Sequence, residues 1–389
     1  MLRSRCVHAA IALGFFVCVA GISCSVSSAI ETVSPVDYLE PVHAWLVGVQ
    51  QPSGLVISRE GLETSDWAVS LYDQSLSAMA FLCLGENERA RLILDVFAGR
   101  QDELEAGLGG FYQFRRVSGD PNTGTNRWLG DNAYLLAALY NYAAMTGDSG
   151  RYEALRSALE EWITGLQQAD SGGLISGTLP DGSEYTNIIV EGNIDAFGAV
   201  PGYTDFHRGI LRYFREQRWD DANRVLVAWP DAPKSSWRYA CDNIAWGVCA
   251  IENLPFPFDF AERIFALTDS SAANGNLSAG FCFDGDKDTI HPEGTLGMVA
   301  AYQVAALDAK AAYYLAETEK LMVPGIGDGS TFGLPYSSGP ATSFGGDVFS
   351  QVHYDRPWVS SSAWYLFVRK GFNPFGYARD RDIPPEDAF

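Results

Sequence analysis

The sequence predicts an all-α fold in which six helical hairpins close into a double ring, with short extended segments between the hairpins. Three observations support this prediction. An apolar, alanine-rich helical pattern recurs six times, an amphipathic helical pattern precedes each copy, and a short glycine-hydrophobic segment follows most of the amphipathic patterns. Such recurrence is typical of repeat architectures, in which each unit buries the hydrophobic face of its neighbour.

The apolar patterns mark the inner helices. In chain order they begin at Ser70, Arg127, Val190, Tyr239, His291 and Ser360. The first five carry an acidic residue near their start, and the sixth carries serines instead. These acids are Asp73, Asp131, Glu191, Asp242 and Glu293, separated by 58, 60, 51 and 51 residues.

The amphipathic patterns mark the outer helices, predicted over residues 35–49, 86–101, 150–167, 204–219, 257–268 and 308–322. The pattern over 150–167 is the clearest, because its apolar residues fall on one helical stripe. The glycine-hydrophobic segments are "SGLVIS", "GGFYQF", "GGLISG", "AGFCFD" and "FGLPYS". We expect edge strands or extended cover there. The fourth repeat has "WPDAPKSSWRY" in this place.

Two concentric layers place the acids together. Apolar helices form the inner ring and amphipathic helices surround it, so every inner helix begins at the same rim. The five acids should therefore converge on one central depression.

Composition excludes several classes of partner. The chain has 389 residues and a formal charge of −21, which argues against nucleic acid and anionic lipid. Cys83, Cys241, Cys249 and Cys282 show no C-x-x-C spacing, so we expect free thiols and no zinc site. We expect a monomer without a cofactor.

The N-terminus has the pattern of a secretory signal. Arg3 and Arg5 precede a short apolar run, and small residues precede position 30. We expect a cleaved signal over 1–29, a single catalytic domain over 30–389, no membrane insertion after cleavage, and a secreted or periplasmic location. A lipoprotein anchored through Cys24 is the less favoured alternative, because Gly21 stands where such signals usually have leucine.

The segments "LYDQSLSAMAFL", "VEGNIDAFGAV", "HPEGTLGMVAAYQVA" and "SSSAWYLFVRKGFNPF" resemble the six-hairpin glycosidase superfamily, the (α/α)6 toroids. The resemblance covers the mature chain. It implies a hydrolase acting on a poly- or oligosaccharide, usually with inversion, with acid and base on different inner helices.

Glycoside hydrolysis needs two carboxyl groups, one acid and one base or nucleophile. We predict that the pair comes from Glu191, Glu293, Asp73 and Asp131, although Asp73, Asp131 and Asp242 could also serve as helix caps. Glu191 and Asp195 lie four residues apart on one helix, where like charges repel and one pKa is expected to rise. The predicted substrate-binding residues are Tyr72, Trp128, Asp195, Asp242, Trp246 and Asp288.

Asp284, Asp286 and Asp288 alternate as in a calcium loop. An EF-hand would need glycine at position 289 and glutamate at position 295, and threonine stands at both. We therefore predict no metal there.

Three other functions remain open. A polysaccharide lyase could use Tyr203, His207 and Arg208 near a neutralised uronate. A sugar epimerase would need histidines, and only His291 lies at an inner-helix start. The third alternative is a glycan-binding protein without catalysis.

Overall fold

The computed structural model describes residues 37–64, 66–105, 109–252, 254–255, 258–327, 329–340, 342–344, 347–349 and 354–389. Residues 37–389 form one compact unit. The predicted signal over 1–29, with Cys24, lies outside the described residues. Within the described ranges, no helix combines the length and apolarity that a membrane span requires.

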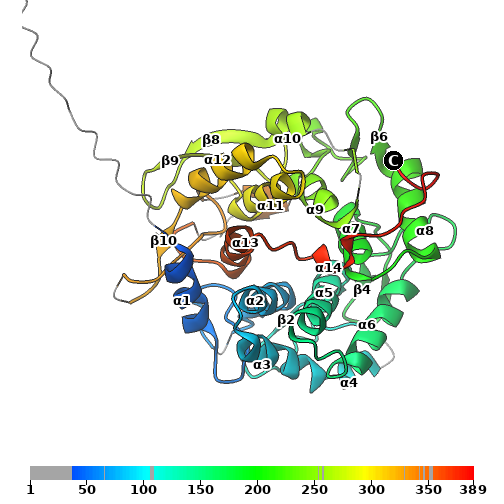
Figure 1. Ribbon diagram of the computed structural model, residues 1–389, viewed down its shortest axis with the longest axis horizontal. Helices are drawn as coiled ribbons and strands as arrows, with labels where there is room; N and C mark the ends of the chain where they lie inside the picture. The colour runs from blue at the N-terminus through cyan, green and yellow to red at the C-terminus, as the bar shows by residue number, and fades with distance from the viewer. Residues whose placement is uncertain are drawn as a thin grey trace, which may run out of the picture. The chain divides into compact units, whose positions relative to one another are not determined.

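Six helices form a closed inner ring (Figure 1). Each packs against the next one in chain order, and the last packs against the first. They are almost wholly buried, which matches their alanine-rich sequences. The inner helices are α2 (Leu71–Cys83), α5 (Leu129–Thr146), α7 (Val190–Ala199), α9 (Cys241–Ala250), α11 (Pro292–Val304) and α13 (Val359–Lys370).

Six further helices lie outside this ring and bury one face against it. They are α1 (Leu39–Val49), α3 (Asn87–Ala98), α6 (Glu153–Gly165), α8 (Asp205–Tyr213), α10 (Phe258–Phe265) and α12 (Asp308–Glu319). Two short helices, α4 (Asp102–Glu105) and α14 (Gly376–Arg379), supplement them. The predicted double ring is confirmed.

Two predicted outer helices are shorter than expected. The helix predicted over 204–219 ends at Tyr213, passes through a π-helical turn (Phe214–Arg218) and enters strand β6 (Trp219–Asp220). The helix predicted over 257–268 ends at Phe265, because Ala266–Ser270 forms β8 and pairs with β9 (Leu277–Phe281). Antiparallel pairing satisfies the backbone groups that the helix would have used.

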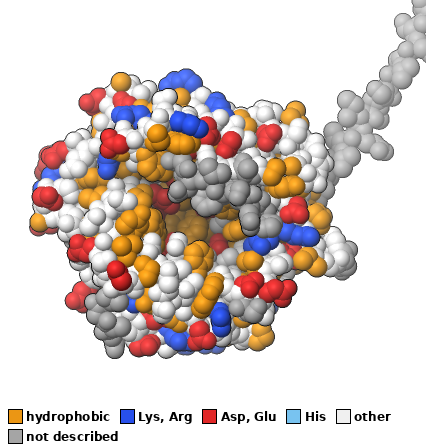
Figure 2. Space-filling view, turned by 180° about the vertical axis from the view of Figure 1, so that it is seen from behind, with side chains coloured by type: hydrophobic (Ala, Val, Ile, Leu, Met, Phe, Trp, Pro, Cys, Tyr) orange, Lys and Arg blue, Asp and Glu red, His pale blue; other side chains and the backbone are white. Residues whose placement is uncertain are grey.

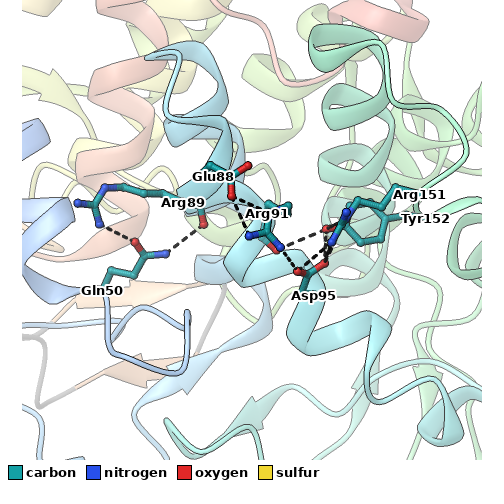
Figure 3. A network of polar contacts seen from close by, with 7 residues as sticks. All are labelled: Gln50, Glu88, Arg89, Arg91, Asp95, Arg151 and Tyr152. Carbon is teal, nitrogen blue, oxygen red and sulfur yellow. Dashed lines mark hydrogen bonds and ion pairs between the residues drawn. The ribbon is translucent and has the colours of Figure 1, made fainter.

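Polar side chains connect consecutive outer helices (Figure 3). Asp95 of α3 accepts hydrogen bonds from Arg151 Nη2 at 3.1 Å and from the Tyr152 hydroxyl at 2.7 Å, just before α6 begins. Gln50, directly after α1, accepts one from Arg89 Nη1 of α3 at 2.9 Å.

The remaining strands are short, antiparallel and located between the helices. β1 (Val69–Ser70) pairs with β2 (Phe114–Arg115), and β3 (Arg127–Trp128), β4 (Gly177–Thr178) and β5 (Glu184–Tyr185) form one sheet. The other pairs are β6 with β7 (Val225–Leu226), β10 (Val323–Pro324) with β11 (Phe332–Gly333), and β12 (Thr342–Phe344) with β13 (Asp347–Phe349).

A side chain at the fourth position of an inner helix holds each glycine-hydrophobic segment. Asn132 accepts from the Phe111 N–H at 2.7 Å and donates to its carbonyl at 3.0 Å, and Asn193 makes the same pair of bonds with Leu174. Gln74 pairs with Val56, Thr295 with Phe281 and Ser362 with Leu334 in the equivalent places. The fourth repeat lacks the segment, and α9 has Ile244 at this position.

The C-terminal segment closes the ring at the end opposite the inner-helix starts (Figure 1). Phe375 is fully buried against Tyr134, with ring centroids 5.4 Å apart. A Cβ at Gly198 would lie 2.4 Å from the Phe375 ring, so glycine permits this approach. Arg381 Nη2 donates to the carbonyls of Phe197 at 2.6 Å and Val200 at 2.7 Å, at the end of α7.

Candidate active site

A cavity of about 680 Å³ opens at the rim where the inner helices begin. Figure 2 shows a hollow on this face, with acidic side chains in its depth and hydrophobic ones around it. Six carboxyl groups line it, those of Asp73, Asp131, Glu191, Asp195, Asp242 and Glu293. They come from five inner helices, and α13 contributes Ser360. The structure therefore brings together the five acids that were expected to converge, with Asp195 further along α7.

Five of these acids occupy the second or third position of their helices. Carboxylates are favoured there because the helix dipole and unpaired N–H groups are nearby. They are not side-chain caps. Among the inner helices, side-chain caps come from Ser70 and His291, while the residues before α5 and α9 (Trp128 and Ala240) provide none.

Burial raises the pKa of every acid in the cavity. It raises the pKa of Glu191 to about 7, with a second contribution from the Glu293 charge. It raises the pKa of Asp73 to about 8. The pKa values of Asp131, Asp195 and Asp242 rise well above their usual range, mainly through burial and then through the neighbouring Glu191 carboxyl.

Glu293 has the strongest hydrogen-bond support in this group. The Tyr72 hydroxyl donates to its Oε1 at 2.5 Å, and Trp364 Nε1 donates to that hydroxyl at 3.4 Å. Burial raises the Glu293 pKa, and the bond from Tyr72 partly offsets the rise.

His291 lies beside Glu293, with Nε2 3.8 Å from Oε2. Burial lowers the His291 pKa to about 3, so its ring is neutral at ordinary pH. Because Nδ1 accepts from the Gly294 N–H at 3.3 Å, we assign the ring proton to Nε2, toward Glu293.

The aromatic wall contains the predicted Tyr72, Trp128 and Trp246. It also contains Trp358, which lies directly before α13, and four residues that the sequence did not single out, Trp67, Phe114, Phe283 and Tyr336. Trp67 is 43% exposed, with the Arg116 guanidinium 4.6 Å from its ring centroid. It lies in a loop without periodicity, so no sequence signal marked it. No lysine or arginine occurs among the described residues that line the cavity.

Asp288 does not reach the cavity, contrary to its predicted binding position. Its carboxylate accepts hydrogen bonds from Thr342 Oγ1 at 3.0 Å and Ser343 N at 2.7 Å, at the start of β12. Within the described part of the chain, the group that could hold a metal is Cys282, Asp286 and Asp288. Asp286 is bound by Trp237 Nε1 at 2.9 Å, so protein donors already hold this loop.

The residues proposed for a lyase also lie elsewhere. The Tyr203 hydroxyl and Arg208 Nε both donate to Asp387 Oδ2, at 2.8 Å and 3.0 Å. His207 Nε2 lies 2.9 Å from the Val200 carbonyl. All four predicted thiols, Cys83, Cys241, Cys249 and Cys282, are free.

Comparisons with known proteins agree with this architecture. No family model matches the sequence. The chain is 28% identical over 204 residues to Exoglucanase-2 of Thermoclostridium stercorarium, a match that covers 49% of this chain. The same match covers only 22% of that protein, so about half of this chain corresponds to about a fifth of the relative's length.

Solved structures share the fold at low identity. A glycosidase variant has a TM-score of 0.59 at 12% identity, over 87% of this chain and 96% of that chain. Cellobiose 2-epimerase of Bacillus thermoamylovorans has a TM-score of 0.54 at 10% identity, over 84% and 95% of the two chains. The predicted six-hairpin toroid is therefore confirmed as the fold.

Proposed function

We propose that this protein is a glycoside hydrolase that cleaves an uncharged poly- or oligosaccharide. The observation that carries the proposal is the cavity itself, in which six carboxyl groups face an aromatic wall and no lysine or arginine occurs among the lining residues that the structure describes. Carboxyl pairs perform this hydrolysis, and aromatic rings pack against sugar faces. The exoglucanase relative and the glycosidase neighbour support the same reaction.

Glu191 is the proposed general acid. Its pKa of about 7 keeps much of it protonated near neutral pH, so it can give a proton to the leaving glycosidic oxygen. Glu293 is the proposed base. Tyr72 supports its ionised form by donating a hydrogen bond, so Glu293 can take a proton from the attacking water. Asp73 and Asp131 are the alternative bases.

We expect inversion at the sugar carbon, as the resemblance to the six-hairpin hydrolases implies, with acid and base on different inner helices, α7 and α11. Water attacks the anomeric carbon while the bond to the leaving oxygen breaks, and the two carboxyls exchange protonation states. Secretion through the 1–29 signal and a monomeric state belong to the same proposal.

The test is release of reducing sugar from gluco-, manno- and xylo-oligosaccharides. The Glu191→Gln substitution should lower kcat by about 10²- to 10⁴-fold, the usual contribution of a general acid. Glu153→Gln, the same change at an exposed acid of α6, is the matched control and should keep full activity. Proton NMR of the first product anomer then reports inversion or retention.

Other outcomes point to other functions. If no glycan is cleaved while binding persists in both wild type and variant, the protein is a glycan-binding protein. An epimerised sugar without new reducing ends would indicate an epimerase that uses His291, a histidine that lines the cavity. An unsaturated product absorbing in the ultraviolet would indicate a lyase.

A further inference from the structure

The beginning of α9 contains buried polar atoms that nothing in the described part of the chain satisfies. Neither carboxylate oxygen of Asp242 accepts a hydrogen bond of normal geometry from a described protein group, and the Trp246 indole Nε1 has no acceptor among these groups. The two side chains are only 2% and 5% exposed, and both line the cavity. The Asn243 backbone N–H lies close enough to offset part of the rise in the Asp242 pKa.

This state is unusual for a folded protein. Buried polar groups are normally paired, because an unpaired one loses its hydration without compensation. Glu293, at the same position of α11, is paired with Tyr72. On the neighbouring α7, Asp195 also has one oxygen, Oδ1, without a donor. Asp73 and Asp131, on α2 and α5, likewise have one oxygen each without a donor, so among the cavity acids of the described chain Asp242 is distinguished by having two.

We propose that Asp242 and Trp246 recognise adjacent hydroxyl groups of the sugar ring that enters the cavity. The carboxyl group of Asp242 exchanges hydrogen bonds with two neighbouring hydroxyls, and Trp246 Nε1 donates to a third sugar oxygen. The assignment rests on the proposed function for the class of ligand, but it does not depend on catalysis.

The indole is held in place for this role. Its ring stacks on Trp364 with centroids 6.2 Å apart, and Tyr134 meets it edge to face at 6.0 Å. A ring fixed from two sides presents its N–H without a further ordering cost on binding. Among the described residues, the side chains close enough to share one metal ion do not include the acids of α7 and α9. A hydroxyl-rich ligand therefore fits these acids better than a metal ion does.

The experiment measures binding without turnover, in a Glu191→Gln background. Isothermal titration calorimetry with cellotriose, maltotriose and derivatives deoxygenated at single ring positions gives the affinities. Asp242→Asn should weaken binding of the better trisaccharide by about 10- to 100-fold, as expected when two hydrogen bonds to the sugar are disrupted. With Asp242 in place, a derivative that lacks a recognised hydroxyl should bind more weakly than the parent sugar. In the Asp242→Asn variant, the parent sugar and that derivative should bind with equal affinity. Trp246→Phe should weaken binding about 3- to 10-fold, as expected for one neutral hydrogen bond.

Thermal stability separates recognition from a structural role. Because Asp242 is buried without partners, Asp242→Asn should leave the Tm of the unliganded protein unchanged or raise it. Asp95→Asn is the matched control, since Asp95 is fully engaged by Arg91, Arg151 and Tyr152. It should lower the Tm and leave sugar binding intact.

Several results would overturn the inference. These are a lower Tm for Asp242→Asn with unchanged deoxy-sugar discrimination, failure of both trisaccharides to bind, or tighter binding of a glucosamine trisaccharide, which would indicate an amine ligand. Binding that depends on Asp242 without any hydrolysis by the wild type would leave the inference standing and remove the proposed function. If the protein hydrolyses the glycan and substitution of Asp242 changes nothing, the proposed function stands and the inference is overturned.

Discussion

Three polar residues of α7 have three different environments. The side chain of Asn193 makes two hydrogen bonds to the Leu174 backbone. Asp195 is 1% exposed, and burial, followed by the Glu191 charge, raises its pKa well above the usual range. This rise favours the neutral form of Asp195, which lessens its repulsion of Glu191 on the same helix face. Glu191 remains the one that titrates near neutrality.

The pH dependence of activity should report that titration. Because Glu191 acts as an acid, kcat/KM should fall as pH rises through about 7, where its carboxyl loses the proton. On the acidic side, kcat/KM should fall once Glu293 is protonated, at a pH above its ordinary pKa, since burial raises that pKa.

Initial rates measured between pH 4 and 9 on one oligosaccharide check this profile. A rate that stays flat from pH 6 to 8 would rule out Glu191 as the acid and direct attention to Asp73.

Sequence reasoning at this scale succeeded where position in the repeat carried the information. The six cavity acids stand at or one turn beyond equivalent helix starts, so their convergence could be predicted. Asn193 could not be explained, because its partner Leu174 is 19 residues away and leaves no local pattern. Asp288 was misplaced for a related reason, since its donors Thr342 and Ser343 lie more than 50 residues further along.

At the scale of the helix, the fourth-position side chain joins each inner helix to its cover segment. Asn193→Ala should lower the free energy of unfolding by about 1–3 kcal/mol, because it leaves the Leu174 N–H and carbonyl buried and unpaired. Urea denaturation measures the change.

The fourth repeat supplies the control. Asn243 of α9 is also buried, but both polar atoms of its side chain lack partners in the described part of the chain. Asn243→Ala removes the same atoms and should cost much less stability. Equal losses in the two variants would show that the backbone bonds of Asn193 contribute little.

The existence and order of the helices were predictable, because each has a strong period and many residues. Their ends were not. Residues 266–268 continue an amphipathic pattern, yet they pair with β9 as a strand. The choice between the two depends on a partner strand that a local pattern does not contain.

At the scale of the whole molecule, the buried acids make stability depend on pH. Asp73 and Glu191 have pKa values of about 8 and 7 in the folded protein, against roughly 4 in an unfolded chain. Between these values the folded state binds more protons than the unfolded state. The free energy of unfolding should therefore decrease as pH rises from about 4 to 8.

Thermal unfolding at pH 5, 6, 7 and 8 tests this expectation, with the highest Tm expected at pH 5. The Asp242→Asn variant should show a shallower decrease, since it removes one of the contributing groups. A Tm that is highest at pH 8 would contradict the expectation that protonation of the buried acids stabilises the folded state.

The ring as a whole was predictable from the repeats, whereas its C-terminal closure was not. Residues 376–389 contain no repeat signal, and the segment after α13 bonds to carbonyls and a side chain of inner helices from distant parts of the chain. Asn141, for example, donates to the Pro374 carbonyl 233 residues away.

That closure determines how molecules pass through the site. With Phe375 packed against Tyr134, described residues fill the end of the ring opposite the cavity mouth, so a glycan chain cannot be threaded between these two rings. Whatever fragment occupies the inner end after cleavage must leave by the route along which the next substrate arrives. Departure of the product and arrival of the substrate are then mutually exclusive, and accumulated product should compete directly with fresh substrate.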